Sequence, residues 1–374
     1  MRVDQYVPGF APYDAIGRHA LQVRRVLRGA GFDSDIWAEQ IHAPLEREAR
    51  PWHPGAGRAA SRGGGGGAGG GNGAVMLYQC STNSAMAGWL VEQGAEGRRI
   101  WSQYHNITPA IYFERWDRRT AQAMTEGREQ LGALAPVVEL AMAVSGFNQK
   151  ELLDAGYSRA AVTPLLVDLD DYHRPPNPKT LARLRRRQRG AEGAQWLFVG
   201  RFVPNKCQHD VIAAFAAYRH LVDHAARLTL VGAVGQPRYH WALRRLAFHL
   251  DLGDSVELLS GLAGDDLLAH WAVADVFVCM SEHEGFCVPL LEAMTLGVPV
   301  VAYAGAAVPE TLGGAGALVD GKDPEAVAQA VALVARPGAR RDTLIKAGYE
   351  RAAAFTLARS SARFLGVVRE VLGG

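Results

Sequence analysis

The sequence contains few cysteines and almost no net charge. Its 374 residues include four cysteines, Cys80, Cys207, Cys279 and Cys287, and none of them forms a C-x-x-C pair. Neither a disulfide framework nor a zinc site is therefore predicted, and we expect a reducing, cytoplasmic environment. The formal net charge is +2, from 40 basic and 38 acidic residues, which argues against nucleic acid as a partner.

Membrane signals are also missing. Residues 1–17 show no basic region followed by an apolar core, and no stretch reaches the roughly 18 uninterrupted apolar residues of a spanning helix. We therefore expect a protein that is neither secreted nor membrane-spanning. One basic run, residues 179–189, is expected to be a solvated helix face, and peripheral contact with the inner membrane surface is the alternative.

The residues that are present describe an ordinary globular protein. With 48% apolar and 21% charged residues, the chain is long enough for two separate cores. Short β-branched and aromatic segments alternate with helical patterns, which predicts an α/β protein with doubly wound parallel sheets. The glycine-rich run at residues 58–73 is not followed by Lys-Ser/Thr, so it is predicted to be a mobile insertion and not a phosphate loop.

Candidate site residues in the first half follow predicted strands, because parallel sheets bind ligands at the carboxyl ends of their strands. The strand Val3 to Val7 is expected to break at Pro8-Gly9, and Asp14 then opens a helix. Gly17 lies in this helix entry, whereas we expect His19 to be a surface imidazole.

A second candidate, His105, directly follows the predicted strand Arg99 to Tyr104. Such strand-end positions often carry chemistry, although a turn-filling histidine is the alternative. Further on, Asp168, Asp170 and Asp171 invite a metal-site interpretation. Their position beside two prolines favours an interdomain linker.

A cationic loop follows the predicted strand Trp196 to Gly200. Arg201 and Lys206 stand five residues apart on this loop. Both side chains can reach one diphosphate, the arginine through a forked contact and the lysine as a point charge. Two fixed cations would stabilise a departing nucleoside diphosphate without a divalent metal. A solvated turn with two surface cations is the alternative.

Two glutamates flank a predicted helix start. A buried strand at Ala274 to Met280 leads into a polar loop, and Pro289 suits the first position of the next helix. The N–H groups of a helix start bind anions, whereas the carboxylates of Glu284 and Glu292 accept hydrogen bonds from hydroxyls. Together they suggest a nucleotide sugar. The simpler interpretation is helix N-terminal charge, worth about 0.5 kcal/mol for each glutamate.

The stretch from Glu284 to Glu292 resembles the E-x7-E motif of retaining GT-B glycosyltransferases, and Gly200 to Lys206 resembles the diphosphate-binding loop of the same family. The resemblance covers nearly the whole chain, most strongly after Gly200. It implies that Glu284 contacts donor-sugar hydroxyls and that Glu292 holds the ribose. The implied donor-binding backbone also includes Gly200, Gly285, Phe286, Cys287 and Val288.

The resemblance implies roles for the other candidates as well. Arg201 and Lys206 would be the principal catalytic groups, with His105 and Glu284 positioning the sugar. The Asp14 to His19 segment resembles the opening loop of polysaccharide-assembling members, which would place Gly17 near donor phosphate or acceptor. Cys287 departs from the family because it stands where a second glycine is usual, which would narrow the sugar pocket. No metal and no other cofactor is implied.

The implied fold is GT-B, with two Rossmann-like domains facing each other across a cleft. We place the N-terminal, acceptor-side domain at residues 1–175 and the C-terminal, donor-side domain at residues 176–355. Residues 356–374 are expected to form a helix that crosses back to the first domain. Helix starts are marked locally, as by Asp323 followed by Pro324.

The implied function is transfer of a hexose-type sugar, with retention of configuration, from a UDP- or GDP-linked donor. The acceptor would be a hydroxyl of a glycan, a lipid-linked glycan or a small molecule. A GT-B nucleotide-sugar epimerase or hydrolase and a non-catalytic nucleotide-sugar binding module are the alternatives. A dinucleotide dehydrogenase is disfavoured because no G-x-G-x-x-G follows the first strand.

Overall fold

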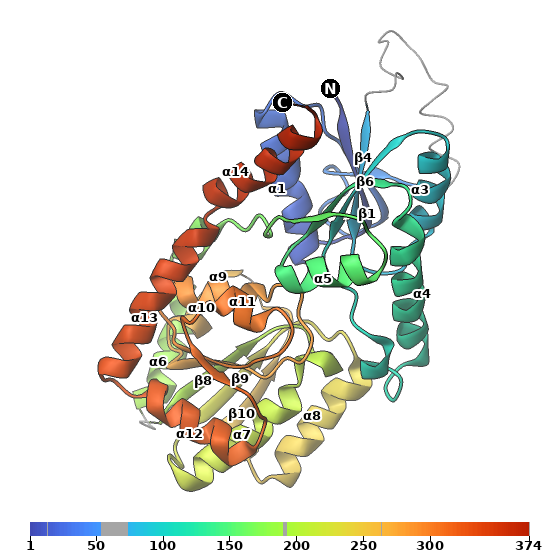
Figure 1. Ribbon diagram of the computed structural model, residues 1–374. Coiled ribbons are helices and arrows are strands. Elements are labelled where there is room, and N and C mark those ends of the chain that lie inside the picture. The colour runs from blue at the N-terminus through green and yellow to red at the C-terminus, as the bar shows by residue number, and fades with distance from the viewer. Residues whose placement is uncertain (13, 54–73, 190–192, 263, 374) are drawn as a thin grey trace. The chain divides into compact units, whose positions relative to one another are not determined.

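The computed structural model describes residues 1–12, 14–53, 74–189, 193–262 and 264–373 (Figure 1). The chain forms two compact units. The first comprises residues 1–114, 118–167 and 355–374, and the second comprises residues 115–117 and 168–354. The run at 58–73, predicted to be an insertion, lies outside the described residues. None of the helices in the described ranges is long and apolar enough to cross a membrane.

The first unit is built on a parallel sheet of seven strands in the order β3-β2-β1-β4-β5-β6-β7. The strand predicted at Arg99 to Tyr104 is confirmed, whereas the break expected at Pro8-Gly9 is wrong because β1 continues to Phe10. Beyond Tyr6, β1 pairs with β2 only, and a strand edge of this kind tolerates proline. The strands are β1 (Val3–Phe10), β2 (Ile36–Ile41), β3 (Arg50–Pro51), β4 (Val75–Cys80), β5 (Arg99–Tyr104), β6 (Val138–Ala143) and β7 (Ala160–Val162).

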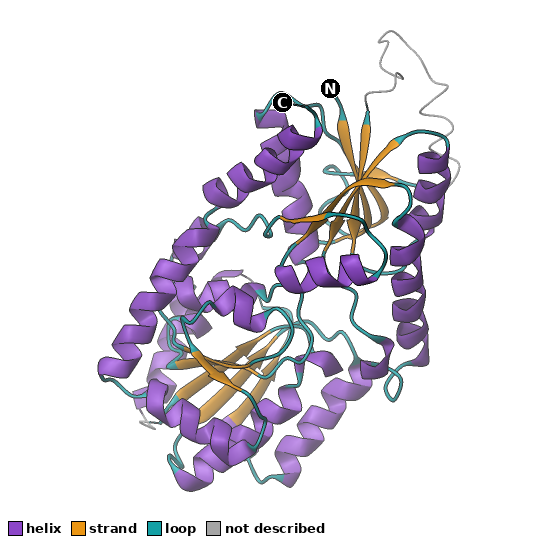
Figure 2. Ribbon diagram, viewed as in Figure 1, coloured by secondary structure: helices purple, strands orange, loops and turns teal. Residues whose placement is uncertain are grey.

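Helices cover both faces of this sheet, as Figure 2 shows. They are α1 (Ala15–Gly29), α3 (Ala85–Ala95), α4 (Arg118–Leu134), α5 (Gly146–Asp154) and α14 (Leu357–Val371), with a 3-10 turn η1 (Ala110–Tyr112). The helix start predicted at Asp14 is confirmed, because its side chain caps α1 by accepting from the Gly17 N–H. From the far end of the chain, Phe364 and Val368 of α14 join the core that contains Val3.

The second unit has a parallel sheet of six strands in the order β10-β9-β8-β11-β12-β13. The predicted strand after residue 195 and the buried strand before the glutamates are confirmed as β8 and β11. All four residues of β11 are buried, as expected for a parallel strand covered on both faces. The strands are β8 (Gln195–Val199), β9 (Arg227–Val231), β10 (Val256–Leu259), β11 (Val276–Cys279), β12 (Val300–Tyr303) and β13 (Ala317–Val319).

The helices of the second unit connect these strands. The prediction at Asp323 is confirmed, since this residue caps α12 and Pro324 follows it. The helices are α6 (Pro178–Arg189), α7 (Gln208–Leu221), α8 (Pro237–His249), α9 (Gly264–Trp271), α10 (Val288–Thr295), α11 (Val308–Leu312), α12 (Pro324–Ala335) and α13 (Ala339–Ala352). Short 3-10 turns are η2 (Leu169–His173), η3 (Pro204–Lys206), η4 (Gly253–Ser255) and η5 (Ala353–Phe355).

The strand order fixes where a ligand can approach the second unit. β8 is flanked by β9 on one side and by β11 on the other, so the connections leave β8 and β11 in opposite directions. Such a switch point, at the carboxyl ends of the strands, is where doubly wound sheets bind ligands. The loop that follows β8 carries Lys206, and the loop that follows β11 carries Glu284.

Candidate active site

Lys206 and Glu284 meet at this switch point. The Nζ atom of Lys206, at the end of η3, donates a hydrogen bond to Oε1 of Glu284 at 2.5 Å. Glu284 is only 6% exposed, so the carboxylate is largely removed from water. Burial by itself disfavours the ammonium form of Lys206, but the neighbouring Glu284 carboxylate outweighs it and raises the pKa of the lysine. The site therefore holds a fixed ammonium group at neutral pH.

Two hydrogen bonds of Asn205, one from its side chain and one to its backbone carbonyl, join the two loops that carry this pair. Asn205 Nδ2 donates to the His283 carbonyl at 3.0 Å, and the Glu282 N–H donates to the Asn205 carbonyl at 3.0 Å. Asn205 was not among the predicted site residues, because neither hydrogen bond leaves a local sequence signal. These bonds fix the spacing between the lysine loop and the glutamate loop.

The helix α10 begins shortly after Glu284 in the chain. The helix begins at Val288, one residue earlier than predicted, so Pro289 takes its second position. Cys287 precedes the helix with a left-handed φ of 64°, a conformation that glycine adopts without strain. The Thr311 hydroxyl donates a hydrogen bond to the Phe286 carbonyl at 2.6 Å and so ties this turn to α11. Gly285 and Phe286 complete this turn between Glu284 and the helix.

Glu292 is buried in the second turn of α10, beyond the first turn where helix N-terminal charge acts, so the simpler interpretation is wrong for this residue. The Tyr172 hydroxyl, from η2, donates to Glu292 Oε1 at 2.7 Å. No sequence pattern linked these residues, because they lie 120 positions apart. The tyrosine comes from the aspartate-rich segment that was predicted to be a linker.

Arg201 is placed differently from Lys206. Its side chain is exposed and lies beside Gly235, where its Nε atom is 3.3 Å from the position that a Cβ on this glycine would take. Within the described parts of the chain, its guanidinium makes no hydrogen bond or ion pair. The structure therefore brings Lys206 and Glu284 together, whereas the Arg201 guanidinium forms no hydrogen bond or ion pair with either of them. The loop that carries Arg201 packs closely against the turn after β9, because the backbones of Gly200 and Gly232 are in contact.

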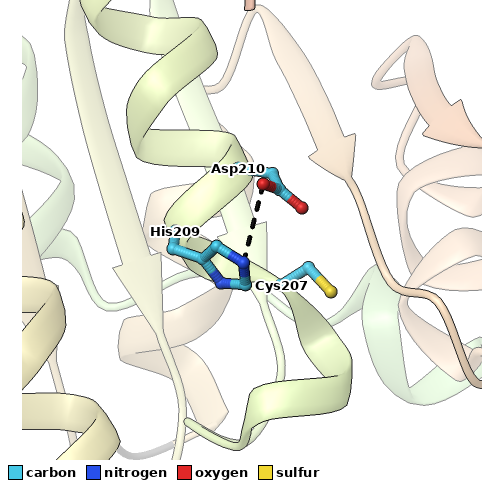
Figure 3. Close-up of side chains that lie close together, drawn as sticks. All are labelled: Cys207, His209 and Asp210. Atoms are coloured by element: carbon cyan, nitrogen blue, oxygen red, sulfur yellow. Dashed lines mark ion pairs between the residues drawn. The ribbon is translucent and has the colours of Figure 1, made fainter. Parts of the chain in front are cut away.

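Among the described residues, two groups of side chains have the spacing of metal ligands. One consists of Cys279, Glu284 and Cys287, and the other consists of Cys207, His209 and Asp210 (Figure 3). In each group the carboxylate already has an ammonium neighbour. Lys206 contacts Glu284, and Lys322 lies 2.9 Å from Asp210. A lysine thus supplies the positive charge that a metal would bring, and we assign a metal to neither group.

In the first unit, the expectation that His19 is a surface imidazole is wrong. The residue lies on the buried face of α1 and is 1% exposed. Its Nδ1 accepts a hydrogen bond from the Leu166 N–H at 3.0 Å, and burial lowers its pKa to about 3. Gly17 is required by packing, since a Cβ there would lie 2.4 Å from the Ala11 carbonyl oxygen.

His105 occupies the predicted strand-end position after β5. Its Nε2 lies 2.6 Å from Gln79 Oε1. Burial, together with the neighbouring His19, lowers the pKa of His105 well below its ordinary value. The ring is therefore neutral at pH 7 and offers hydrogen bonds but no charge.

Comparison with known proteins connects this geometry to a family. Residues 184–351 match the family model for glycosyl transferases group 1. A GDP-mannose-dependent alpha-(1-6)-phosphatidylinositol monomannoside mannosyltransferase of Mycobacterium tuberculosis is 36% identical over 198 residues, which cover 50% of each chain. A D-inositol 3-phosphate glycosyltransferase of Geodermatophilus obscurus is 33% identical over 255 residues, covering 65% of this chain and 54% of that protein. The chain thus spans about half the length of these curated relatives.

The fold comparison extends over both units. The crystal structure of Anabaena HepE in complex with UDP superposes with a TM-score of 0.76 and 18% identity, covering 99% of this chain and 100% of that one. The matched family segment includes both loops of the Lys206–Glu284 pair. Residues 184–351 therefore resemble the glycosyl transferases group 1 family, and the chain has the GT-B fold.

Proposed function

We propose that this protein transfers a sugar from a nucleoside diphosphate sugar to a hydroxyl acceptor, with retention of configuration. The observation that carries the proposal is the contact of 2.5 Å between Lys206 and Glu284 at the switch point, beside the start of α10. An ammonium group suits a diphosphate, and a carboxylate suits sugar hydroxyls. One site therefore offers partners for both halves of an activated sugar.

We assign the residue roles from this placement together with the pattern of the family that the chain resembles. Lys206 stabilises the negative charge that develops on the leaving diphosphate, and Arg201, on the neighbouring exposed turn, adds a second cation. Glu284 accepts hydrogen bonds from the sugar, and Glu292 accepts them from the ribose. The leaving diphosphate then helps to remove the proton of the acceptor hydroxyl on the same face of the sugar. By the family pattern, we assign His105 to the sugar. Gly17 is assigned to the donor phosphate or the acceptor.

The donor and the acceptor are proposed from the relatives. We assign a GDP-linked hexose, with GDP-mannose as the first candidate, because the mycobacterial relative is named as GDP-mannose-dependent. UDP-glucose is the second candidate, since HepE has also been crystallised with it. Both curated relatives carry inositol in their names, so we propose an inositol-containing, lipid-linked or free glycan as acceptor. The four buried free cysteines support a reducing, cytoplasmic location.

The first experiment identifies the donor. A thermal-shift screen of GDP-mannose, UDP-glucose and a dTDP-sugar should show stabilisation by one of them, because a ligand that binds only the folded state raises the melting temperature. Transfer is then measured with phosphatidylinositol and with inositol phosphate, and the anomer of the product is determined by NMR. Lys206→Ala should lower the transfer rate by at least about a thousandfold. Unchanged turnover would remove the diphosphate assignment.

A second experiment separates transfer from hydrolysis and tests the ribose role. Nucleotide release that needs no acceptor would indicate a hydrolase or epimerase. Glu292→Ala should weaken nucleoside diphosphate binding in calorimetry by about tenfold, because one hydrogen-bonding carboxylate is lost. Glu310→Ala, on α11, provides a control of the same charge outside the assigned site. Equal affinities for the Glu292 and Glu310 variants would remove the ribose assignment.

A further inference from the structure

A chain of buried amide groups crosses the sheet of the first unit and ends at His105. Gln5 on β1 and Gln79 on β4 are both completely buried. Gln5 Nε2 donates to the Ala20 carbonyl oxygen at 3.0 Å, and Gln79 Nε2 donates to Gln5 Oε1 at 2.8 Å. Gln79 Oε1 then lies 2.6 Å from His105 Nε2. Buried glutamines in a sheet interior are uncommon, and these two form one continuous hydrogen-bonded line.

The direction of every hydrogen bond in this line is set at its first atom. The Ala20 carbonyl oxygen can only accept, so the amide nitrogen of Gln5 must face it. The Gln5 oxygen therefore faces Gln79, which must donate with its own nitrogen. The Gln79 oxygen is left for His105, whose Nε2 must carry the hydrogen. Because the buried ring is neutral, its Nδ1 carries a lone pair and no proton.

The neighbouring His19 is fixed in the opposite sense by another backbone group. The Leu166 N–H can only donate, so Nδ1 of His19 accepts and its Nε2 carries the hydrogen. The rings of His19 and His105 meet edge to face, with their centroids 5.1 Å apart. The pair therefore contains one ring nitrogen that must accept and one that must donate.

These two nitrogens are the ones that remain unused. Within the described residues, His105 Nδ1 and His19 Nε2 are buried atoms that have no hydrogen-bond partner. A buried polar atom without a partner is costly and needs an explanation, such as a ligand that completes it. A hydroxyl group fits both atoms, because its oxygen accepts from one ring while its hydrogen is donated to the other.

We propose that Gln5 and Gln79 are positioning residues that hold His105 as its Nε2–H tautomer, so that His105 Nδ1 accepts and His19 Nε2–H donates to a hydroxyl of the substrate. The identity of this hydroxyl as part of a transferred sugar or its acceptor rests on the proposed function. The tautomer of His105 does not depend on the proposed function. In this arrangement His105 orients a hydroxyl and does not take up a proton.

The tautomer is read directly from imidazole nitrogen shifts. In protein labelled with 15N, long-range 1H–15N spectra at pH 7 should show a protonated Nε2 and an unprotonated Nδ1 for His105. Gln79→Leu removes the acceptor and should give a mixture of tautomers. Gln103→Leu is the matched control, because Gln103 is equally buried on the adjacent β5 but bonds to Thr163. A protonated Nδ1 in the wild-type protein would overturn the proposal, and so would equal effects of the two variants.

The role of the hydroxyl is tested separately. Gln79→Leu should lower kcat/KM for the donor or the acceptor by about tenfold, whereas Gln103→Leu should change it less than twofold. A shifted tautomer with unchanged kcat/KM would overturn the hydroxyl assignment. If no nucleotide sugar is transferred by the wild-type protein, the proposed function fails while the tautomer result still stands. Gln5→Leu, which frees the Gln79 amide to turn, gives a second variant should Gln79→Leu not fold.

Discussion

The Lys206 ammonium lies 2.5 Å from the buried carboxylate of Glu284, so removal of one partner leaves the other without compensation. We expect Lys206→Met to lower the free energy of unfolding by about 3 kcal/mol. The double variant Lys206→Met with Glu284→Gln should recover most of this stability, because no charge is left unpaired. It should recover no activity, because both charged groups of the site are removed. Urea denaturation measures both effects.

The control for this prediction is an ion pair of the same type at the surface. Lys150 and Asp154 lie 2.6 Å apart on α5, and both side chains are exposed. Lys150→Met should change the free energy of unfolding by less than about 0.5 kcal/mol, because water screens exposed pairs. Equal losses for Lys206→Met and Lys150→Met would show that burial of Glu284 does not matter to stability.

The buried histidines predict a loss of stability in acid. Burial lowers the pKa of His19 to about 3 and that of His105 well below 6.5. Between these values and pH 6.5 the unfolded chain binds protons that the native chain does not bind. Stability is therefore fully present above pH 6.5 and falls as the pH drops, by up to about 1.4 kcal/mol per pH unit for each histidine. Urea midpoints from pH 7.5 to 4.5 measure this slope.

A variant assigns the slope to one residue. His19→Gln retains a polar side chain but removes one titrating group, so its stability should depend less steeply on pH. His249→Gln, which replaces an exposed histidine at the end of α8, is the matched variant for comparison. A His19→Gln slope identical to that of the wild-type protein would contradict the assignment.

Among the structural elements, the turns after β8 and β9 pack backbone against backbone. A Cβ on Gly232 would lie 1.9 Å from the Gly200 carbonyl oxygen, and backbone atoms cannot move aside cheaply. We expect Gly232→Ala to lower the free energy of unfolding by about 1 to 3 kcal/mol and to weaken nucleoside diphosphate binding, because it displaces the loop that carries Arg201 and Lys206. Denaturation and calorimetry measure the two effects.

A glycine in open space gives the matched control. Gly88 lies inside α3, and apart from its chain neighbours and the backbone of its own helix no described atom lies within 4 Å of its missing Cβ. Gly88→Ala should therefore stabilise the protein by about 0.5 to 1 kcal/mol, because alanine is a better helix former. If Gly232→Ala also stabilised the protein, the close approach of the two turns would be refuted.

Element boundaries show how far local patterns reach. The cap at Asp323 and the strand after Arg99 were predictable because capping residues and buried β-branched runs act over a few positions. The helix α10 begins one residue earlier than predicted. The strand β1 continues through Pro8, because the pairing of β1 with β4 ends at Tyr6. Local chemistry indicates where an element lies, whereas its partners decide where it stops.

At the scale of the whole molecule, the last helix supplies part of the core of the first unit. Phe364 of α14 is 1% exposed and shares a cluster with Val3 and Val75. Phe364→Ala should lower the stability of the first unit by about 3 to 5 kcal/mol, because it leaves a cavity. Hydrogen exchange of the β1 and β4 amides measures this loss within that unit.

Phe248 on α8 provides the control, since it is 80% exposed. Phe248→Ala should change amide protection in β1 and β4 by no more than about 0.5 kcal/mol. Loss of protection in β1 and β4 by both variants, or by neither, would contradict the assignment of α14 to this core.

The sequence by itself determined the α/β class, most strands, the helix caps and the two motifs that contain Lys206 and Glu284, because periodicity and turn chemistry are properties of neighbouring residues. Only the tertiary structure decided that the loops after β8 and β11 lie side by side and that Tyr172 meets Glu292. It also decided that His19 is buried beside His105. Strand order and packing join residues far apart in the chain, and no local pattern encodes which of them meet.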